Sequence, residues 1–338
     1  YEIGNMIFDV WDTSSRRYKL VYSGRDTPDG TYTEHIGFAV SSNGKDWTKV
    51  GHITTRRAED PYMVYDGSKW HVFCEDKEGG VTNNIRHYTS ADFVTWVDEG
   101  HVLLNGPPGS WDATDVSSPL VWIEDDVWYM FFEGRAPRNG GAIGLATSTD
   151  GYTWTKHPDN PIVIPNAEYF GSMEPDVPHA VSVVPDDLIK VNGVYHMTTH
   201  ANLFGSGFQP YRLVSRDLLN WTPLPLDARF AFPSPEDGTV MLCEIRGELH
   251  ALICRPKHGL FVSKLANPNA PWLEQLTAQD NIHAGPFVTI GAGGSWISRG
   301  VSIYAPFSLL IDSDRDLDIS AQAAVHLGGT NPWTLNIP

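Results

Sequence analysis

The sequence predicts an all-β fold, a five-bladed β-propeller of four-stranded antiparallel blades, and three observations support this prediction. A turn of the form Ser-x-Asp that leads to a tryptophan recurs along the chain, and its tryptophans lie at positions 47, 96, 154, 221 and 272. Each copy follows apolar and aromatic segments separated by short turns, such as Tyr62 to Tyr65 and Trp70 to Phe73. No stretch shows a sustained helical period with capping residues, so we expect little helix.

The copies of this turn define the units in chain order. The spacings between their tryptophans are 49, 58, 67 and 51 residues, which is the length of a four-stranded antiparallel unit with its turns. Hairpin turns such as Asp66-Gly67 join the strands within a unit. The copies span residues 41–47, 90–96, 148–154 and 215–221, and a degenerate fifth copy spans 263–272. A β-sandwich would not repeat a whole four-stranded unit, and the turns of a parallel β-helix are much shorter.

The repeat also predicts the domain organisation. Residues 1–285 form the propeller, which we expect to be the catalytic domain. Residues 286–338 lie outside the repeat, and they are β-rich with an apolar run from Val301 to Ile311. We expect this C-terminal segment to complete an edge of the propeller or to pack on one of its ends.

Composition excludes several classes of function. The chain has 24 basic and 41 acidic residues, a net charge of −17, and such a surface repels nucleic-acid phosphates. No stretch reaches the ~18 consecutive apolar residues of a membrane helix. Cys74, Cys243 and Cys254 form no Cys-x-x-Cys pattern, and we interpret them as buried free thiols. The chain opens at Tyr1 without a basic and apolar leader, so we expect no signal peptide in this sequence, and the removal of one stays open.

Acidic residues gather at one predicted mouth of the central channel. In a propeller the first strand of each blade lines the channel, so residues just before those strands meet residues that follow the second strands. Converging carboxyl groups suit glycoside cleavage, which needs one to protonate the leaving oxygen and another to activate water or attack the sugar. Residues before the first strands include Glu2, Asn5, Asp112, Ser117, Ser118 and Asp186. Asp66, Asp125, Asp150 and Asp217 are interpreted as turn formers and excluded.

Three segments of the chain carry distinctive motifs: Ala58-Glu59-Asp60-Pro61, Trp128 to Arg135, and Ile143 to Trp154 with Asp159-Asn160-Pro161. Their resemblance is to the five-bladed propeller glycosidases, which comprise glycoside hydrolase families 43, 62, 32, 68, 117 and 130. It covers about residues 6 to 222. It implies a propeller fold and a glycosidase that acts on an oligo- or polysaccharide.

Different motifs are similar to different families. Glu59-Asp60-Pro61 is similar to the catalytic Glu-Asp-Pro motif of family 130 and to the Arg-Asp-Pro motif of family 32, although Tyr62 replaces the arginine that follows in family 130. Met173-Glu174-Pro175-Asp176 is similar to the acid motif of family 32 without its cysteine. Family 43 would place a base at the start of the first inner strand. Aligned with Asp60, that position is Met6, and only Glu2 or another loop offers an acid there.

These observations together predict the site residues. We expect Asp60 to stabilise the transition state or tune a neighbouring acid, Glu174 to act as general acid, and Asp115 or Asp187 to act as base or hydroxyl ligand. Trp111 is expected to stack on a sugar or, equally, to pack within its loop. The other substrate-binding candidates are Glu59, Glu133, Arg135, Asp176, His179, His200, Glu236 and Arg255.

Two other functions stay open at this point. A propeller without a base in its first unit serves equally as a non-catalytic carbohydrate-binding module. A phosphate-dependent phosphorylase needs a cationic pocket, for which Arg135, Arg255, Lys257 and His258 are candidates. We expect no cofactor and no catalytic metal, with a structural calcium in the channel left open. We expect a carbohydrate as partner, neither nucleic acid nor membrane, and an extracellular or periplasmic location, while the sequence leaves the oligomeric state undetermined.

Overall fold

The computed structural model describes most of the first 224 residues and parts of the rest. The described residues are 2–9, 12–25, 34–42, 47–76, 83–136, 139–165, 182–202, 208–224, 239–245, 248–255, 259–264, 281–282, 296–297, 310–311 and 326–327. Within them the chain is all-β, as the sequence predicts. The part of the chain so described has no helix with the length and apolarity to cross a membrane.

The strands pair with their sequence neighbours in antiparallel meanders. The first meander contains β1 (Glu2–Phe8), β2 (Tyr18–Arg25), β3 (Glu34–Ser41) and β4 (Thr48–His52). The second contains β5 (Ala58–Tyr65), β6 (Trp70–Asp76), β7 (Asn84–Ser90) and β8 (Val97–Leu103). The third contains β9 (Asp115–Glu124), β10 (Val127–Ala136), β11 (Asn139–Ser148) and β12 (Thr155–Lys156).

Two further meanders follow in the second half of the chain. The fourth contains β13 (Ser182–Val191), β14 (Val194–Asn202), β15 (Phe208–Ser215) and β16 (Thr222–Pro223). The fifth contains β17 (Thr239–Ile245), β18 (Glu248–Arg255), β19 (Gly259–Lys264) and β20 (Asn281–Ile282). A parallel bridge between Gly141 and Ser182 joins the third meander to the fourth.

The C-terminal segment contributes short strands to the described structure. β21 (Trp296–Ile297) pairs in parallel with β1, so the segment returns to the inner edge of the first meander. β22 (Leu310–Ile311) pairs with β23 (His326–Leu327). The expected boundary at residue 285 stays a prediction, because most of the segment lies outside the described residues.

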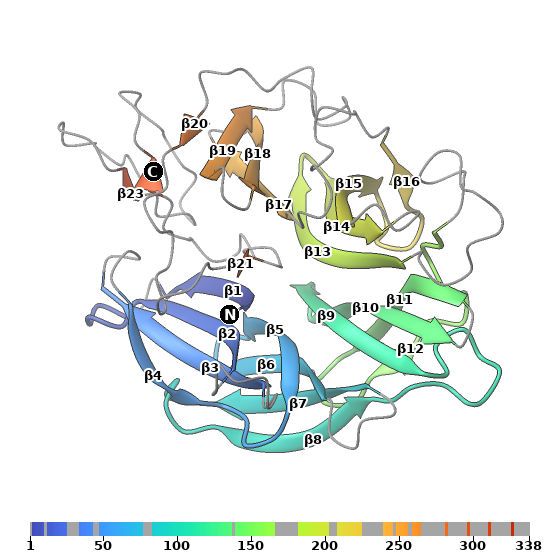
Figure 1. The fold of residues 1–338 in the computed structure, drawn as a ribbon, viewed down its shortest axis with the longest axis horizontal. Coiled ribbons are helices and arrows are strands. Elements are labelled where there is room, and N and C mark those ends of the chain that lie inside the picture. The colour runs from blue at the N-terminus through green and yellow to red at the C-terminus, as the bar shows by residue number, and fades with distance from the viewer. Residues whose placement is uncertain are drawn as a thin grey trace.

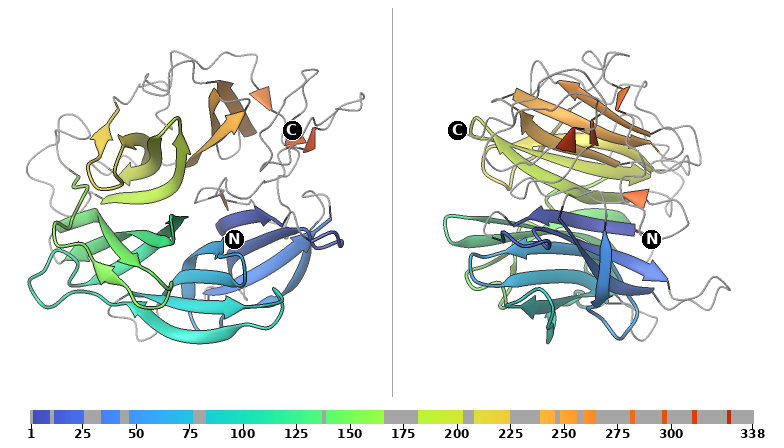
Figure 2. Two further views of the ribbon diagram at one scale, coloured as in Figure 1. Left: turned by 180° about the vertical axis from the view of Figure 1, so that it is seen from behind. Right: turned by 90° about the vertical axis from the view of Figure 1, so that its left-hand side faces the viewer.

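The meanders follow one another around a common centre (Figure 1). The first strands β1, β5, β9 and β13 lie on the inside, and β5 contacts both β1 and β9. The view from behind in Figure 2 shows the same circular order. Corresponding positions of the inner strands therefore lie around one centre, which is what positions the candidate site.

Aromatic residues fill the space between neighbouring meanders. Phe38, Trp70 and Phe93 pack in one buried cluster between the first and second meanders. Phe73, Phe131 and Trp221 belong to a larger cluster that continues through the second, third and fourth. Burial of such side chains stabilises the fold by about 25 cal/mol per Å² of apolar surface. Most aromatic side chains that the structure describes thus serve the core.

The repeated Ser-x-Asp turn has one geometry in three described copies. In the third meander, Asp150 accepts hydrogen bonds from the backbone N–H groups of Tyr152 and Thr153, each at 2.7 Å, and from Ser148 at 2.8 Å. Asp92 and Asp217 make the same contacts in the second and fourth meanders. These aspartates are turn formers, as the sequence analysis interprets two of them.

The residue after each aspartate adopts a left-handed backbone conformation. It is Phe93, Gly151 or Leu218, with φ of 55°, 74° and 65°. Phe93 and Leu218 are buried in the core, whereas a side chain at Gly151 would meet the ring of Trp128 at 3.0 Å. The third meander therefore needs glycine where the others insert an apolar side chain between neighbouring sheets.

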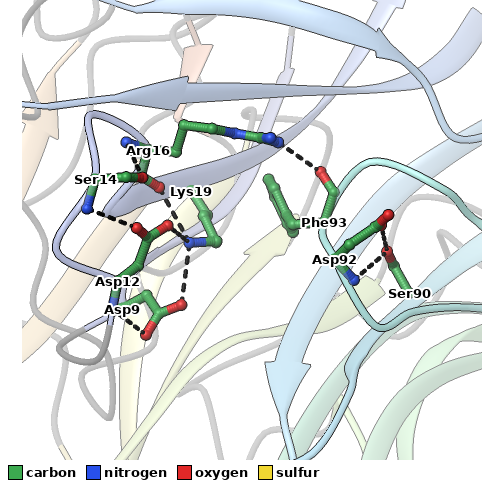
Figure 3. A network of polar contacts seen from close by, with 8 residues as sticks. All are labelled: Asp9, Asp12, Ser14, Arg16, Lys19, Ser90, Asp92 and Phe93. Carbon is green, nitrogen blue, oxygen red and sulfur yellow. Dashed lines mark hydrogen bonds and ion pairs between the residues drawn. The ribbon is translucent and has the colours of Figure 1, made fainter.

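A buried lysine joins the first meander to the second. Lys19 is 3% exposed, and its Nζ donates to Asp9 at 3.1 Å, Asp12 at 2.8 Å and the Arg16 carbonyl at 3.0 Å (Figure 3). The same ammonium lies 5.1 Å from the centre of the Trp70 ring, close enough for a cation–π interaction. Arg16 also donates to the Phe93 carbonyl at 3.1 Å. All three donors of a buried ammonium are thereby satisfied.

Candidate active site

A bulge at the same height interrupts each described inner strand of the first four meanders. The register shifts between Ile3 and Met6 in β1, Glu59 and Tyr62 in β5, Ser117 and Leu120 in β9, and Pro185 and Asp187 in β13. Such bulges re-aim side chains and are common beside active sites. The first bulged residues are Gly4, Asp60, Ser118 and Asp186, which therefore occupy corresponding positions around the centre.

This register corrects the sequence alignment of the first meander. Met6 was expected to align with Asp60, but the bulges align Gly4 with Asp60 and Met6 with Tyr62. The next residue, Asn5, is fully buried and exchanges two hydrogen bonds of 2.7 Å with the backbone of Met63. The first bulge thus ties β1 to β5 and carries no carboxylate.

Asp60 is held in a strained backbone conformation at the bulge of β5. Its φ is 53°, and Ser118, with φ of 55°, donates from Oγ to Asp60 Oδ2 at 2.9 Å. The Asp60 N–H donates to Ser23 Oγ at 3.2 Å. Left-handed backbone at residues other than glycine is uncommon and, where surrounding contacts hold it, clusters at functional sites.

Asp186 carries a histidine partner in the fourth meander. His200 Nδ1 lies 2.5 Å from Asp186 Oδ1, and the side chains are 17% and 0% exposed. The neighbouring Asp187 is also fully buried and accepts a 2.9 Å hydrogen bond from the Leu188 N–H. Of these two acids, Asp186 is the one in the position that corresponds to Asp60.

Glu133 is buried and accepts hydrogen bonds from residues of both the third and the fourth meanders. It is 1% exposed and receives two 2.8 Å hydrogen bonds from the Arg135 guanidinium and one of 3.2 Å from Ser117. Ser182 donates to it from β13. Burial lowers the pKa of Arg135, but the charges of Glu133, Glu75 and Asp115 outweigh it and raise that pKa above its usual value.

Asp115 lies at the seam between the second and third meanders. Its Oδ1 accepts the Asn83 N–H at 3.3 Å, and Asn83 Nδ2 donates to Glu75 Oε1 at 2.5 Å. Glu59, on β5, accepts a 3.3 Å hydrogen bond from Arg57, which also lies 3.5 Å from Glu34. Each of these acids is therefore held by a polar partner from the chain around it.

Trp111 packs against protein on one of its faces. Its ring stacks on Phe132 with centroids 5.7 Å apart, and Cβ atoms at Gly134 and Gly144 would meet it at 2.3 and 2.7 Å. Two glycines thus make room for the ring. For the ring face that contacts Phe132, the structure supports the interpretation that Trp111 packs within the protein.

Some predicted site residues lie outside the described residues. They are Glu174, Asp176, His179 and Glu236, and the side chain of Arg255 is also outside the description although its backbone belongs to β18. The structure brings Asp60, Asp115, Glu59, Glu133 and Arg135 to the second and third meanders, and Asp187 and His200 to the fourth.

The sequence predicts Ser118 and Asp186 near the mouth without a role for either. The bulges place both residues in positions that correspond to Asp60. One signal for the third meander is visible in the sequence, since Asp60 and Ser118 each precede a proline. Among the described residues, no group of three or more His, Cys, Asp or Glu side chains could hold a metal ion.

Comparisons with known proteins agree with this architecture. No family model and no curated protein sequence matches the chain. A solved glycoside hydrolase aligns over 80% of this chain and 88% of its own, with 17% identity and a TM-score of 0.56. An endo-arabinase from Bacteroides thetaiotaomicron aligns over 80% and 96%, with 13% identity and a TM-score of 0.54.

A third solved structure belongs to glycoside hydrolase family 32. It is a β-fructofuranosidase of Bombyx mori, aligned over 74% of this chain and 54% of its own, with 16% identity and a TM-score of 0.50. At these identities the likeness concerns the fold alone. The chain shares the all-β fold of the propeller-type glycoside hydrolases.

Proposed function

We propose that the chain is a glycoside hydrolase on a five-bladed propeller of four-stranded blades, and that it cleaves glycosidic bonds of an oligo- or polysaccharide. The shared fold supports the architecture. The observation that carries the activity is the placement of Asp60 and Asp186 in corresponding bulges of β5 and β13, on either side of β9. Two carboxyl groups facing one centre are the minimal equipment for this chemistry.

The chemistry assigns a role to each group. Asp60 is the carboxylate that acts on the sugar or stabilises the positive charge that develops on it. Proton transfer to the leaving oxygen falls to Glu174, as the sequence suggests, or to His200 backed by Asp186. Asp115 keeps its proposed role as base or hydroxyl ligand, whereas the bulge of β13 favours Asp186 over Asp187 for the fourth meander, because Asp186 is in the position that corresponds to Asp60.

Arg135 bears on the choice between hydrolysis and phosphorolysis. Its guanidinium is engaged by Glu133 at 2.8 Å and lies in the field of Glu75 and Asp115. Phosphate binding needs positive charge that is not already neutralised. This supports water rather than phosphate as the acceptor. We also propose an extracellular or periplasmic enzyme without a cofactor.

The test is hydrolysis of a panel of aryl glycosides and oligosaccharides, with and without phosphate, by the wild type, Asp60→Asn and Asp186→Asn. Asparagine is the proper replacement because it tolerates left-handed backbone as aspartate does. Asp125→Asn is the matched control, since Asp125 also has positive φ, 51°, but lies exposed in the β9–β10 turn.

We expect Asp60→Asn to lower kcat/KM by on the order of a thousandfold and the control to stay within twofold of wild type. A phosphate requirement would make the chain a phosphorylase. Sugar binding by calorimetry without turnover of any substrate would make it a binding module.

A further inference from the structure

We propose that Ser118 is a positioning residue for Asp60, and that its hydroxyl orients the carboxylate and holds it in the ionised form. This inference deepens the proposed function and depends on it for the role of Asp60. The contact itself is direct, because Ser118 Oγ donates to Asp60 Oδ2 at 2.9 Å across the seam between β9 and β5.

Asp60 and Ser118 make this contact although both have an unfavourable backbone conformation. Asp60 and Ser118 both have left-handed φ, 53° and 55°, and each begins the bulge of its strand. Such a conformation is unfavourable for residues other than glycine and persists where surrounding contacts hold it. The hydrogen bond from Ser118 to Asp60 is a contact that holds the two residues in this conformation.

Ser118 is buried, so a water molecule cannot easily take over the hydrogen bond of its hydroxyl to Asp60. Ser118 is 3% exposed, and its hydroxyl points to a carboxylate that is itself half-buried. A hydroxyl that donates to a carboxylate stabilises the charged form over the protonated one. The Asp60 N–H is fixed separately by Ser23, so the backbone and the side chain of Asp60 are held by different partners.

The preceding residue offers a matched control within the same strand. Ser117 is also 3% exposed and also donates to a carboxylate, but its partner is Glu133 at 3.2 Å. Glu133 has Arg135 as a stronger partner, at 2.8 Å. Loss of the Ser117 hydroxyl therefore removes a similar buried contact without touching Asp60.

Two substitutions at Ser118 separate the hydroxyl from the backbone strain. Ser118→Gly removes the hydroxyl and relaxes the left-handed backbone, and glycine occupies the corresponding bulge position of β1 at Gly4. Ser118→Ala removes the hydroxyl and keeps the strain. If the hydroxyl is what matters, both variants behave alike in activity although their stabilities differ.

The experiment measures kcat, KM and the pH profile of kcat for wild type, Ser118→Gly, Ser118→Ala, Ser117→Ala and Asp60→Asn. We expect both Ser118 variants to lower kcat by roughly 10- to 100-fold with little change in KM. We also expect the acidic limb of their profiles to move to higher pH. Ser117→Ala should stay within threefold of wild type with an unmoved profile.

A substrate-free readout separates failure of this inference from failure of the proposed function. The Asp60 carboxyl is titrated by ¹³C NMR, with its resonance assigned by difference from Asp60→Asn. Its titration midpoint should rise in Ser118→Gly and Ser118→Ala and stay fixed in Ser117→Ala. An unmoved midpoint overturns the role of Ser118 whatever the enzyme does, whereas an active Asp60→Asn variant overturns the role of Asp60 instead.

Discussion

His200 Nδ1 lies 2.5 Å from Asp186 Oδ1, a buried carboxylate oxygen. The other ring nitrogen, Nε2, therefore faces away from Asp186. The two residues come from adjacent strands of one hairpin, β13 and β14. A buried carboxylate fixes the tautomer of its histidine and stabilises the imidazolium form. The pair is therefore equipped to give or take a proton at its outer nitrogen.

The leaving group decides whether this pair is the proton donor. His200→Asn should lower kcat on phenyl glycosides by roughly 100- to 10,000-fold and leave 2,4-dinitrophenyl glycosides nearly unchanged, because a good leaving group needs no protonation. Glu174→Gln is measured beside it as the competing donor. If only Glu174→Gln shows this dependence on the leaving group, His200 is a binding residue.

Two stacked histidines predict a loss of stability in acid. His71 Nδ1 lies 2.9 Å from His87 Nε2, and His71 Nε2 lies 3.0 Å from Asp66 Oδ2. Burial lowers the pKa of both rings, that of His87 to about 3. The positive charge of Lys69 lowers both pKa values further. The negative charges of Asp66 and Glu99 near His71, and of Asp150 near His87, offset only part of this shift. Because the unfolded chain then binds more protons, stability is full above about pH 6.5 and falls from there toward pH 3.

The variant His87→Gln tests this linkage, because its amide still donates to His71 but does not titrate. At pH 5 the wild type should have lost about 2 kcal/mol through His87 alone, and the variant should lose less on going from pH 8 to pH 5. The free energy of unfolding is measured in urea at both pH values. His157→Gln serves as control, and an equal pH dependence in wild type and His87→Gln would contradict the assignment.

The repeated turns predict a smaller effect at lower pH. Backbone N–H groups of Thr153 and Tyr152 lower the pKa of Asp150 to about 2, so its contribution is present above pH 3.8 and is lost as the pH falls toward 2. Asp150→Ala should lower the free energy of unfolding at pH 7 by about 1 kcal/mol, as for a lost helix cap. Asp159→Ala, at an exposed site beside His157, should cost less than half as much. Equal losses would mean that the turn geometry adds nothing.

Lys19 predicts the strength of the contact between the first two meanders. Lys19→Met keeps an apolar chain over Trp70 but leaves Asp9 and Asp12 without their ammonium, which should cost about 2 kcal/mol. The control is Lys49→Met, since Lys49 is exposed and lies 5.9 Å from the Tyr22 ring. Thermal unfolding compares the two, and a Lys19→Met variant as stable as its control would show that the ion pairs of Lys19 with Asp9 and Asp12 add nothing to stability.

The sequence by itself determined the local structure of this protein. Asp66-Gly67 and the Ser-x-Asp copies specify their own turns, because a short acidic side chain bonds to the backbone N–H groups two and three residues later. The alternating aromatic segments predict half-buried strands, and their regular repetition predicts neighbouring sheets. All of this depends on residues close together in the chain.

Only the tertiary structure decided which polar residues take corresponding positions on the inner strands. A bulge shifts the strand register by one residue, and such a shift exchanges the side chains that face each side. No local sequence pattern indicates the position of a bulge in its strand. That is why Gly4 rather than Met6 corresponds to Asp60, why Asp186 rather than Asp187 takes the equivalent place, and why Ser118 reaches a carboxylate 58 residues away.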